Sequence, residues 1–237
     1  MTGQNNEDRI SPKLQGSLGC AIFIASAVLL TALSAVAAEP ATIVFSLDFP
    51  NSSPEHYVIS VESDGKAHYE SSGRISADSD ARDEYAMDCT FTDSTRARIF
   101  ALAAQAHYFS GKVDSGNKKL AFTGAKKLVY RDGQRNSSAD YNFSTLQPVQ
   151  QLTVLFQSVA ATLEFGRRMT YFHRYQKLAL DDELKRMEDQ ARRGDLAELQ
   201  AVKPVLQEIY DDGSVINVVR ARAHRIMEMP QGTTAER

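Results

Sequence analysis

Two serine–lysine pairs in this chain have the spacing that the acylating serine and its lysine have in penicillin-interacting enzymes. The pairs are Ser63-Asp64-Gly65-Lys66 and Ser115-Gly116-Asn117-Lys118. In such an enzyme the serine hydroxyl attacks a carbonyl carbon, and a companion Lys-Thr-Gly element completes the site. The chain has no Lys-Thr-Gly, and both pairs lie in turn-rich sequence. We therefore predict no catalytic serine at either position and assign no catalytic residue from a motif.

A group of acids between residues 78 and 84 has the residue types of a calcium site, because Ca²⁺ prefers carboxylate oxygens. The group comprises Asp78, Asp80, Asp83 and Glu84. An EF-hand loop that starts at Asp78 would need an oxygen ligand at Arg82, a glycine at Asp83 and a glutamate at Cys89. None of these three residue types is present there, so the group predicts a solvated acidic loop.

The histidines show no pair at a metal-ligand spacing. They are His56, His68, His107, His173 and His224. The chain also lacks the short motifs of zinc proteases, nucleotide-binding loops, α/β-hydrolases and thiol redox sites. We therefore expect no metal and no cofactor, and a non-enzymatic protein is favoured over an enzyme. A catalytic triad can be assembled from residues far apart in sequence, so a hydrolase stays open as an alternative.

Aromatic and basic residues are interleaved in residues 165–177, which in a cytoplasmic protein would indicate nucleic-acid binding. They are Phe165, Arg167, Arg168, Tyr171, Phe172, Arg174, Tyr175 and Lys177. The chain has 27 basic and 30 acidic side chains and a net charge of −3, which argues against a nucleic-acid partner. Two alternatives remain: contact with an anionic lipid or polymer, or a helix with buried rings and solvated arginines.

Four further lysines lie in or beside the expected strands, and we expect them on exposed strand edges, where lysine hinders edge-to-edge pairing. They are Lys118, Lys119, Lys126 and Lys127.

Leu18–Ala38 has no charged side chain and follows a leader that contains Arg9 and Lys13. A basic leader, an apolar run and closing small residues are the parts of a secretory signal, and cleavage is expected after Ala37 or Ala38. The alternative is a single-pass anchor, because about 20 apolar residues can cross a bilayer. The rest of the chain is then periplasmic or secreted after cleavage. If the segment is not cleaved, the chain is held at the inner membrane by this segment alone.

Cys89 is the one cysteine outside the expected leader, since Cys20 lies inside it. A lone cysteine forms no internal disulfide, so the exported part must depend on its hydrophobic core. Cys89 belongs to an alternating apolar pattern, which predicts a buried thiol.

Residues 41–143 show mainly the two-residue period of half-buried strands. The alternating apolar residues are Ile43, Phe45, Leu47 and Phe49, then Tyr57, Ile59, Val61, Ala67 and Tyr69, then Tyr85, Met87, Cys89 and Phe91. A three-residue turn at Ser63-Asp64-Gly65 pairs Val61 with Ala67 and Ile59 with Tyr69, and sets Glu62 opposite Lys66. In a second strand group, residues 119–143, a two-residue Asp132-Gly133 turn puts five apolar side chains on one face: Leu128, Tyr130, Ala139, Tyr141 and Phe143.

Two helices are expected among these strands. One is expected to be capped by Asp93 or Ser94 and to end near Tyr108, with Ile99, Phe100, Ala103 and Ala104 facing inward. Pro148 opens the other, whose apolar residues Val149, Leu152, Phe156, Val159 and Leu163 recur at helical spacing. The order of strands, helix, strands and helix predicts an α+β domain over residues 39–165, an antiparallel sheet with helices packed on one face.

Residues 166–229 predict a C-terminal bundle of short helices, and residues 230–237 a disordered tail. One helix begins at Asp181-Asp182-Glu183 and ends at Arg192-Arg193-Gly194, so that both charged groups suit the helix dipole. Asp195–Glu198 has the pattern of a capping box for the next helix, which is expected to restart at Pro204. The last helix carries Val215, Ile216, Val218, Val219, Ile226 and Met227.

The pattern of Pro54, Tyr57, Asp64-Gly65 and Tyr69 resembles one found in small uncharacterised bacterial exported domains. In both, a proline and a nearby tyrosine precede an Asp-Gly hairpin, a second tyrosine follows it, and a helix comes later. The resemblance implies a bacterial envelope setting and no particular activity, because the function of that family is unknown.

The features together favour a non-enzymatic envelope protein that binds another envelope protein or a polymer. The alternatives are a periplasmic hydrolase without a familiar motif and a membrane-tethered scaffold or regulatory protein. The sequence indicates neither a particular partner nor an oligomeric state.

Overall fold

The computed structural model describes residues 39–74 and 82–229 of the chain. The expected signal segment with Ala37 and Ala38, the acids Asp78 and Asp80, and the expected tail 230–237 lie outside these residues. No helix in the described part is long and apolar enough to cross a membrane.

The described chain forms an antiparallel sheet with strand order β4-β3-β2-β1-β5-β6. The strands are β1 (Thr42–Asp48), β2 (His56–Glu62), β3 (Lys66–Arg74), β4 (Arg82–Thr90), β5 (Ala125–Arg131) and β6 (Asn136–Tyr141). In β1, β2 and β3 every second residue is buried, as the alternating apolar pattern requires. β1 lies in the interior of the sheet, so Ile43 and Phe45 are fully buried.

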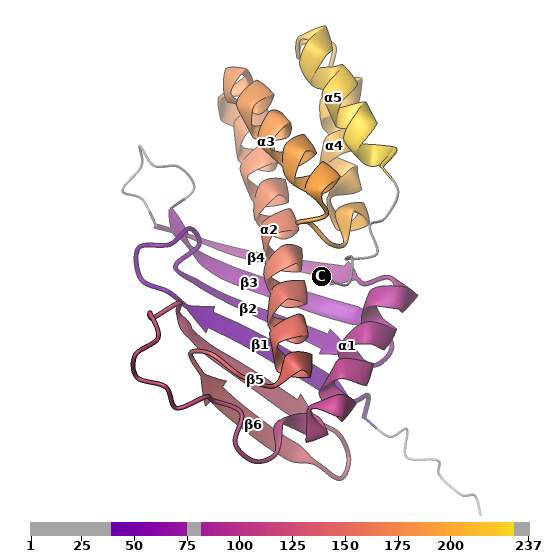
Figure 1. The fold of residues 1–237 in the computed structure, drawn as a ribbon. Helices are drawn as coiled ribbons and strands as arrows, with labels where there is room; N and C mark the ends of the chain where they lie inside the picture. Colours follow the sequence, from indigo (N-terminus) through magenta and orange to yellow (C-terminus); the bar gives the residue numbers. More distant parts are fainter. Residues whose placement is uncertain (1–38, 75–81, 230–237) are drawn as a thin grey trace, which may run out of the picture. The chain divides into compact units, whose positions relative to one another are not determined.

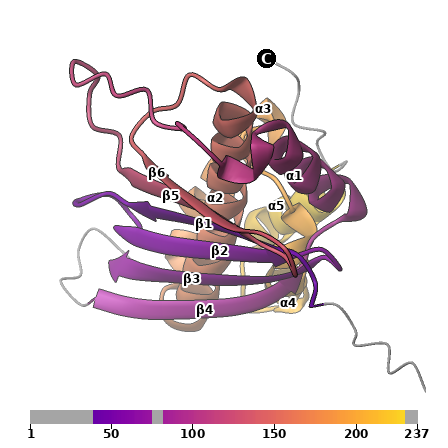
Figure 2. The same cartoon turned by 90° about the horizontal axis from the view of Figure 1, so that it is seen from below.

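Two helices pack on one face of this sheet, α1 (Asp93–Gln105) and α2 (Gln147–Tyr175) (Figures 1 and 2). Phe45 of β1 stacks on Phe156 of α2, with ring centroids 5.1 Å apart. The apolar residues expected to face inward from the start of α2 are all buried: Val149, Leu152, Phe156, Val159 and Leu163. The predicted α+β fold, with helices on one face of an antiparallel sheet, is therefore confirmed.

The C-terminal helices follow in the order α3 (Leu180–Arg193), α4 (Lys203–Asp211) and α5 (Asn217–Met227). Short 3₁₀ turns lie at His107–Phe109, Lys177–Ala179 and Leu199–Val202. α2 is one continuous helix across residue 166, where the separate helical domain was expected to begin, and it contacts both the sheet and α3 (Figure 1). Gly194 ends α3 in the left-handed conformation, at φ 75°, as its sequence predicts.

The first hairpin has the predicted register, with Val61 opposite Ala67 and Ile59 opposite Tyr69. Gly65 has φ 96°, which the three-residue turn requires. Lys66 forms its ion pair with Asp64 inside the turn, at 2.7 Å, and not with Glu62.

The second hairpin corrects the predicted turn. Leu128 pairs with Ala139, and the Asp132 N–H donates to the Arg135 carbonyl at 2.9 Å, so the tightest part of the turn is Gly133-Gln134. The Asp132 carboxylate causes this shift, because it accepts from the backbone N–H groups of Gln134 and Arg135. The buried face holds four of the five expected side chains, but Phe143 lies beyond β6 and is exposed.

Three local predictions about the helices were wrong. Thr92, and not Asp93 or Ser94, caps α1, and Ala104 is exposed while Leu102 is buried. Asp195–Glu198 is not a capping box, because Glu198 has left-handed backbone angles and points to another helix.

Candidate functional site

Two adjacent hollows lie along one side of α2 and meet at Gln157, which lines both. We call the pair the α2 groove. One end, the Lys126 hollow, has a volume of about 430 Å³ and lies between the start of α2 and the ends of β5 and β6. The other end, the Glu164 hollow, has a volume of about 300 Å³ and lies between α2 and the loop after β1.

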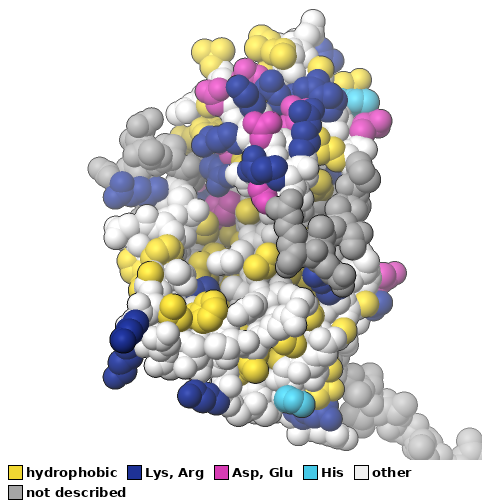
Figure 3. Space-filling model, in the orientation of Figure 1, with side chains coloured by type: hydrophobic (Ala, Val, Ile, Leu, Met, Phe, Trp, Pro, Cys, Tyr) yellow, Lys and Arg dark blue, Asp and Glu magenta, His cyan; other side chains and the backbone are white. Residues whose placement is uncertain are grey.

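The two ends of the α2 groove differ in charge. Apolar side chains gather over the lower, sheet part of the face shown in Figure 3, and arginines with acids gather over the C-terminal helices.

Along α2 the groove runs from Gln150 to Arg168, about 27 Å at 1.5 Å per residue. It is therefore long enough for an extended molecule with an apolar middle part.

The loop after β1 forms one wall of the Glu164 hollow through Ser52, Ser53 and Pro54. Gly73 on β3 lets this loop approach closely, because a Cβ at Gly73 would lie 3.1 Å from the Glu55 nitrogen and 3.2 Å from the Pro54 Cα. Its φ of 156° is also one that side chains rarely adopt.

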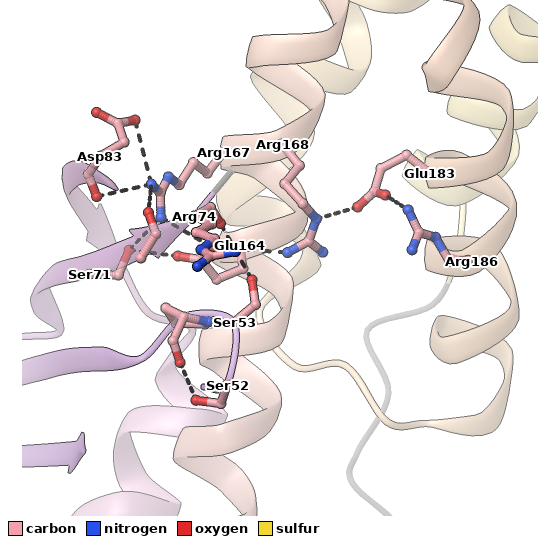
Figure 4. A network of polar contacts seen from close by, with 12 residues as sticks. Ser52, Ser53, Ser71, Arg74, Asp83, Glu164, Arg167, Arg168, Glu183 and Arg186 are labelled. Carbon is pink, nitrogen blue, oxygen red and sulfur yellow. Dashed lines mark hydrogen bonds and ion pairs between the residues drawn. The ribbon is translucent and has the colours of Figure 1, made fainter. Parts of the chain in front are cut away.

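A buried carboxylate, Glu164, lies at the base of this hollow (Figure 4). One of its oxygens accepts from the Tyr69 hydroxyl at 2.9 Å and the Ser71 hydroxyl at 2.6 Å. The other oxygen lies 3.5 Å from Arg167 and 3.9 Å from Arg168. Burial, and secondly the Glu164 charge, raise the pKa of Tyr69, so its hydroxyl stays protonated as a donor. Glu164 thus has its charge balanced and its oxygens occupied.

Arg167 connects α2 to two strands. Its guanidinium is buried and donates to the Gly73 carbonyl at 3.3 Å and to the Asp83 carbonyl at 3.1 Å. The same nitrogen lies 3.4 Å from the Asp83 carboxylate. The prediction of solvated arginines in residues 165–177 is therefore wrong for Arg167, although Phe165 and Phe172 are buried as expected. Hydrophobic periodicity does not register a buried arginine, because it scores the residue type and not its partners.

Arg168 continues the network toward α3. Its Nε donates to Glu183 at 2.6 Å, and Glu183 also receives a hydrogen bond from Arg186 (Figure 4). Glu183 is fully buried. This row of alternating charges holds α3 beside α2 and closes the charged end of the groove.

Lys126 lies in the wall of the other hollow and is 5% exposed. The prediction of an exposed edge lysine is wrong for this residue, because β5 lies between β1 and β6 and position 126 faces the helices. Its neighbour Lys127 is exposed and pairs with Asp140 at 3.5 Å, on the other face of the sheet.

The contacts recorded for the two serine–lysine pairs are with other groups. Lys66 Nζ binds Asp64, while the Ser63 carbonyl accepts from Arg96 at 3.1 Å. The Ser115 hydroxyl accepts from the Asn117 N–H at 3.3 Å within an exposed turn.

The histidines are dispersed over the described residues. Three of them lie within hydrogen-bonding distance of a carboxylate. His56 lies 2.6 Å from Asp48, His68 lies 2.6 Å from Asp88 and 3.1 Å from Glu70, and His173 lies 2.9 Å from Asp212. His56 is opposite Ser72 and His68 is opposite Ser60, so the two do not face each other. In residues 39–74 and 82–229 no three metal-binding side chains come together.

Asp83 and Glu84, from the expected acidic loop, are exposed on β4. Cys89 is only half-buried on the same strand. Burial, and then the charges of Glu198 and Asp88, raise the pKa of the Cys89 thiol to about 11, so it is protonated at neutral pH and unreactive.

The sequence reasoning did not predict that Glu188 is buried. Glu188 of α3 accepts from Arg192 at 2.6 Å, from Arg222 at 3.1 Å and from Arg225 at 2.9 Å, which joins α3 to α5. The hydrogen bond from Arg225, opposed by burial, lowers the pKa of Glu188. The Arg192 pair has the helical i,i+4 spacing that a sequence shows, but the partners on α5 come from the fold alone.

No known family model matches this chain, and no curated protein matches it either. The resemblance to small exported bacterial domains therefore stays a prediction.

Proposed function

We propose that the protein is an exported, envelope-associated binding module that holds part of another envelope component in the α2 groove. The observation that carries this proposal is the groove itself, two neighbouring hollows along α2 that share Gln157 as a lining residue. Pockets of 300 Å³ and more with apolar walls and a few polar groups are the usual form of ligand sites.

The hydrogen bonds and ion pairs of Glu164 favour a binding function over hydrolysis. A general base needs an oxygen or nitrogen that can reach a substrate proton, whereas the Glu164 oxygens are occupied by Tyr69, Ser71 and two arginines. Ser71 donates its hydroxyl proton to this carboxylate and is itself buried. The network is suited to holding α2 against β3 and not to attacking a substrate.

Site-specific photo-crosslinking in the native host tests the proposal. A photoreactive amino acid replaces Val154, whose side chain lines the groove and is 52% exposed. The matched control replaces Asp140, which is exposed on the opposite face of the sheet. We expect a discrete adduct from position 154 and none of the same mass from position 140.

Equal labelling from both positions, or no adduct from position 154 in cells that produce folded protein, would refute a groove-based binding function. Intact-mass analysis of the same material decides between export and tethering. A chain that begins at Ala38 or Glu39 indicates cleavage, while an uncut chain in the membrane fraction supports the tethered alternative.

A further inference from the structure

Charge balance singles out Lys126 among the buried ionisable groups. Six charged side chains are buried in the described residues: Lys126, Glu164, Arg167, Glu183, Glu188 and Glu198. Four of these are in ion pairs. Glu198 instead accepts from the backbone and hydroxyl of Thr92 at the N-terminus of α1, where the helix dipole favours an anion. Lys126 has no ion pair with any described residue.

The Lys126 ammonium is held by neutral oxygens alone. It donates to the Thr123 carbonyl at 3.0 Å, the Thr123 hydroxyl at 3.0 Å, the Gly124 carbonyl at 3.2 Å and the Asn142 carbonyl at 2.9 Å. A neutral amine has only two N–H groups, so four acceptors fit the charged form. Burial lowers the pKa of Lys126, and no acid opposes this effect. A buried charge without a counter-ion is costly and uncommon.

The wall of the hollow beside this ammonium includes apolar side chains. Phe143, Val154 and Tyr141 line it. Exposed apolar side chains continue along the neighbouring segments at Leu120, Phe122 and Leu146.

Several polar groups in the wall are already paired with one another. The Tyr141 hydroxyl lies 2.6 Å from the Thr153 hydroxyl, and Gln150 donates to the Ser144 carbonyl at 2.7 Å. The Phe143 carbonyl accepts from the Ser115 N–H at 2.8 Å. A peptide would bring backbone N–H and C=O groups that find few partners here, which would weaken its binding. An acyl chain brings none.

We propose that the Lys126 hollow binds the carboxylate of an acyl chain, a fatty-acid anion, with the chain along the apolar part of the α2 groove. The proposal rests on the binding function proposed above and names the ligand class for one end of the groove. The carboxylate supplies the counter-ion that Lys126 lacks, and because the three N–H groups of the ammonium already face four neutral oxygens, it takes the place of one of them. The chain covers Phe143 and Val154.

Binding of octanoate to the full-length protein, measured by titration calorimetry, tests this proposal. Octanamide, which has the same chain without the charge, is the ligand control. We expect octanoate to bind about tenfold or more tightly than octanamide, because a charge-assisted bond in a desolvated site discriminates by at least that factor. A short peptide with a leucine carboxyl terminus is expected to bind more weakly than octanoate.

Lys126→Met and Lys127→Met form a matched pair of variants, since each removes one positive charge from adjacent positions of β5. We expect Lys126→Met to weaken octanoate binding by about tenfold or more and to leave octanamide binding unchanged. Lys127→Met, on the other face of the sheet, should leave both unchanged.

Val154→Asp, at an exposed position of α2, is the second variant should Lys126→Met not fold. Its carboxylate competes for the same ammonium and should weaken octanoate binding.

Equal affinity for octanoate and octanamide, full binding by Lys126→Met, or tighter binding of the peptide would overturn the proposal. These outcomes leave the crosslinking result at position 154 untouched, so failure of the ligand assignment is distinguishable from failure of the binding function.

Discussion

His68 shows how single residues on the sheet surface respond to pH. It lies on the face turned away from α1 and α2, where Nδ1 is 2.6 Å from Asp88 and Nε2 is 3.1 Å from Glu70. The hydrogen bond with Asp88, then that with Glu70, raise its pKa above the usual 6.5, and partial burial opposes them. The charged imidazolium is therefore favoured in the folded protein.

The raised pKa predicts a loss of stability with rising pH. A group whose folded pKa is higher than its unfolded pKa contributes its full stabilisation below the unfolded value, about 6.5, and loses it as pH rises through the folded value. Since His68 is 42% exposed, solvent screening keeps the contribution below about 1 kcal/mol.

Urea unfolding at about pH 5.5 and about pH 8.5 measures this effect, the two values lying on either side of the usual pKa. We expect His68→Gln to reduce the difference in unfolding free energy between the two conditions. In an NMR titration Asp88→Asn should lower the pKa of His68. A histidine that titrates below 6.5 in the folded protein would contradict the prediction.

At the scale of single residues, the sequence does not predict contacts between residues that are far apart along the chain. Thr92 caps α1 with its own hydroxyl, a local role that lies one residue from the predicted position. The carboxylate that receives the Thr92 N–H belongs to Glu198, at 2.9 Å. The Asp195–Glu198 pattern predicted a local cap, but its acid instead serves another helix, which no local pattern can indicate.

At the scale of elements, the apolar period predicted the first half of α2 and missed the second. The five apolar residues expected to face inward are buried: Val149, Leu152, Phe156, Val159 and Leu163. Beyond them the helix buries Glu164 and Arg167, whose contacts with β3 and β4 depend on the arrangement of the strands. The apolar period also led to the prediction that the first domain ends at residue 165, although α2 continues to Tyr175.

Gly166 lies at the point where α2 meets the turn before α4. A Cβ added there would lie 2.6 Å from Val202 Cγ1. Alanine would gain about 1 kcal/mol of helix propensity, but overpacking of a buried contact costs about 1–3 kcal/mol. Because the Val202 side chain is short and fully packed, we expect Gly166→Ala to lower the free energy of unfolding by about 1 kcal/mol.

A double-mutant cycle checks this expectation by urea unfolding. Val202→Ala removes the clashing methyl groups, so Gly166→Ala made in that background should be neutral or stabilising, with a coupling of about 1 kcal/mol or more. Gly213→Ala is the control, since nothing lies within 4 Å of its Cβ position. Additive effects of the two substitutions would show that Gly166 is not a contact point.

At the scale of the whole molecule, polar contacts link the part of the chain before residue 166 to the part after it. Arg167 binds the Gly73 and Asp83 carbonyls, and Glu198 binds Thr92. Each of these links joins residues 84 or more apart in sequence. The sequence predicted both the sheet and the C-terminal helices. It placed the boundary between the two domains after residue 165, which lies inside α2.

These links predict that residues 39–229 unfold in one transition, because neither part can lose its structure without leaving buried charges of the other unpaired. Leu206→Ala on α4 removes a fully buried side chain and should lower the unfolding free energy by about 2–5 kcal/mol. In native-state hydrogen exchange the most protected amides of β1 should then lose the same amount of free energy as those of α4. If β1 kept its protection while α4 and α5 exchanged more readily, the helical part would be a separate domain. The charged contacts of Arg167 and Glu198 would in that case be a docking interface between two folding units.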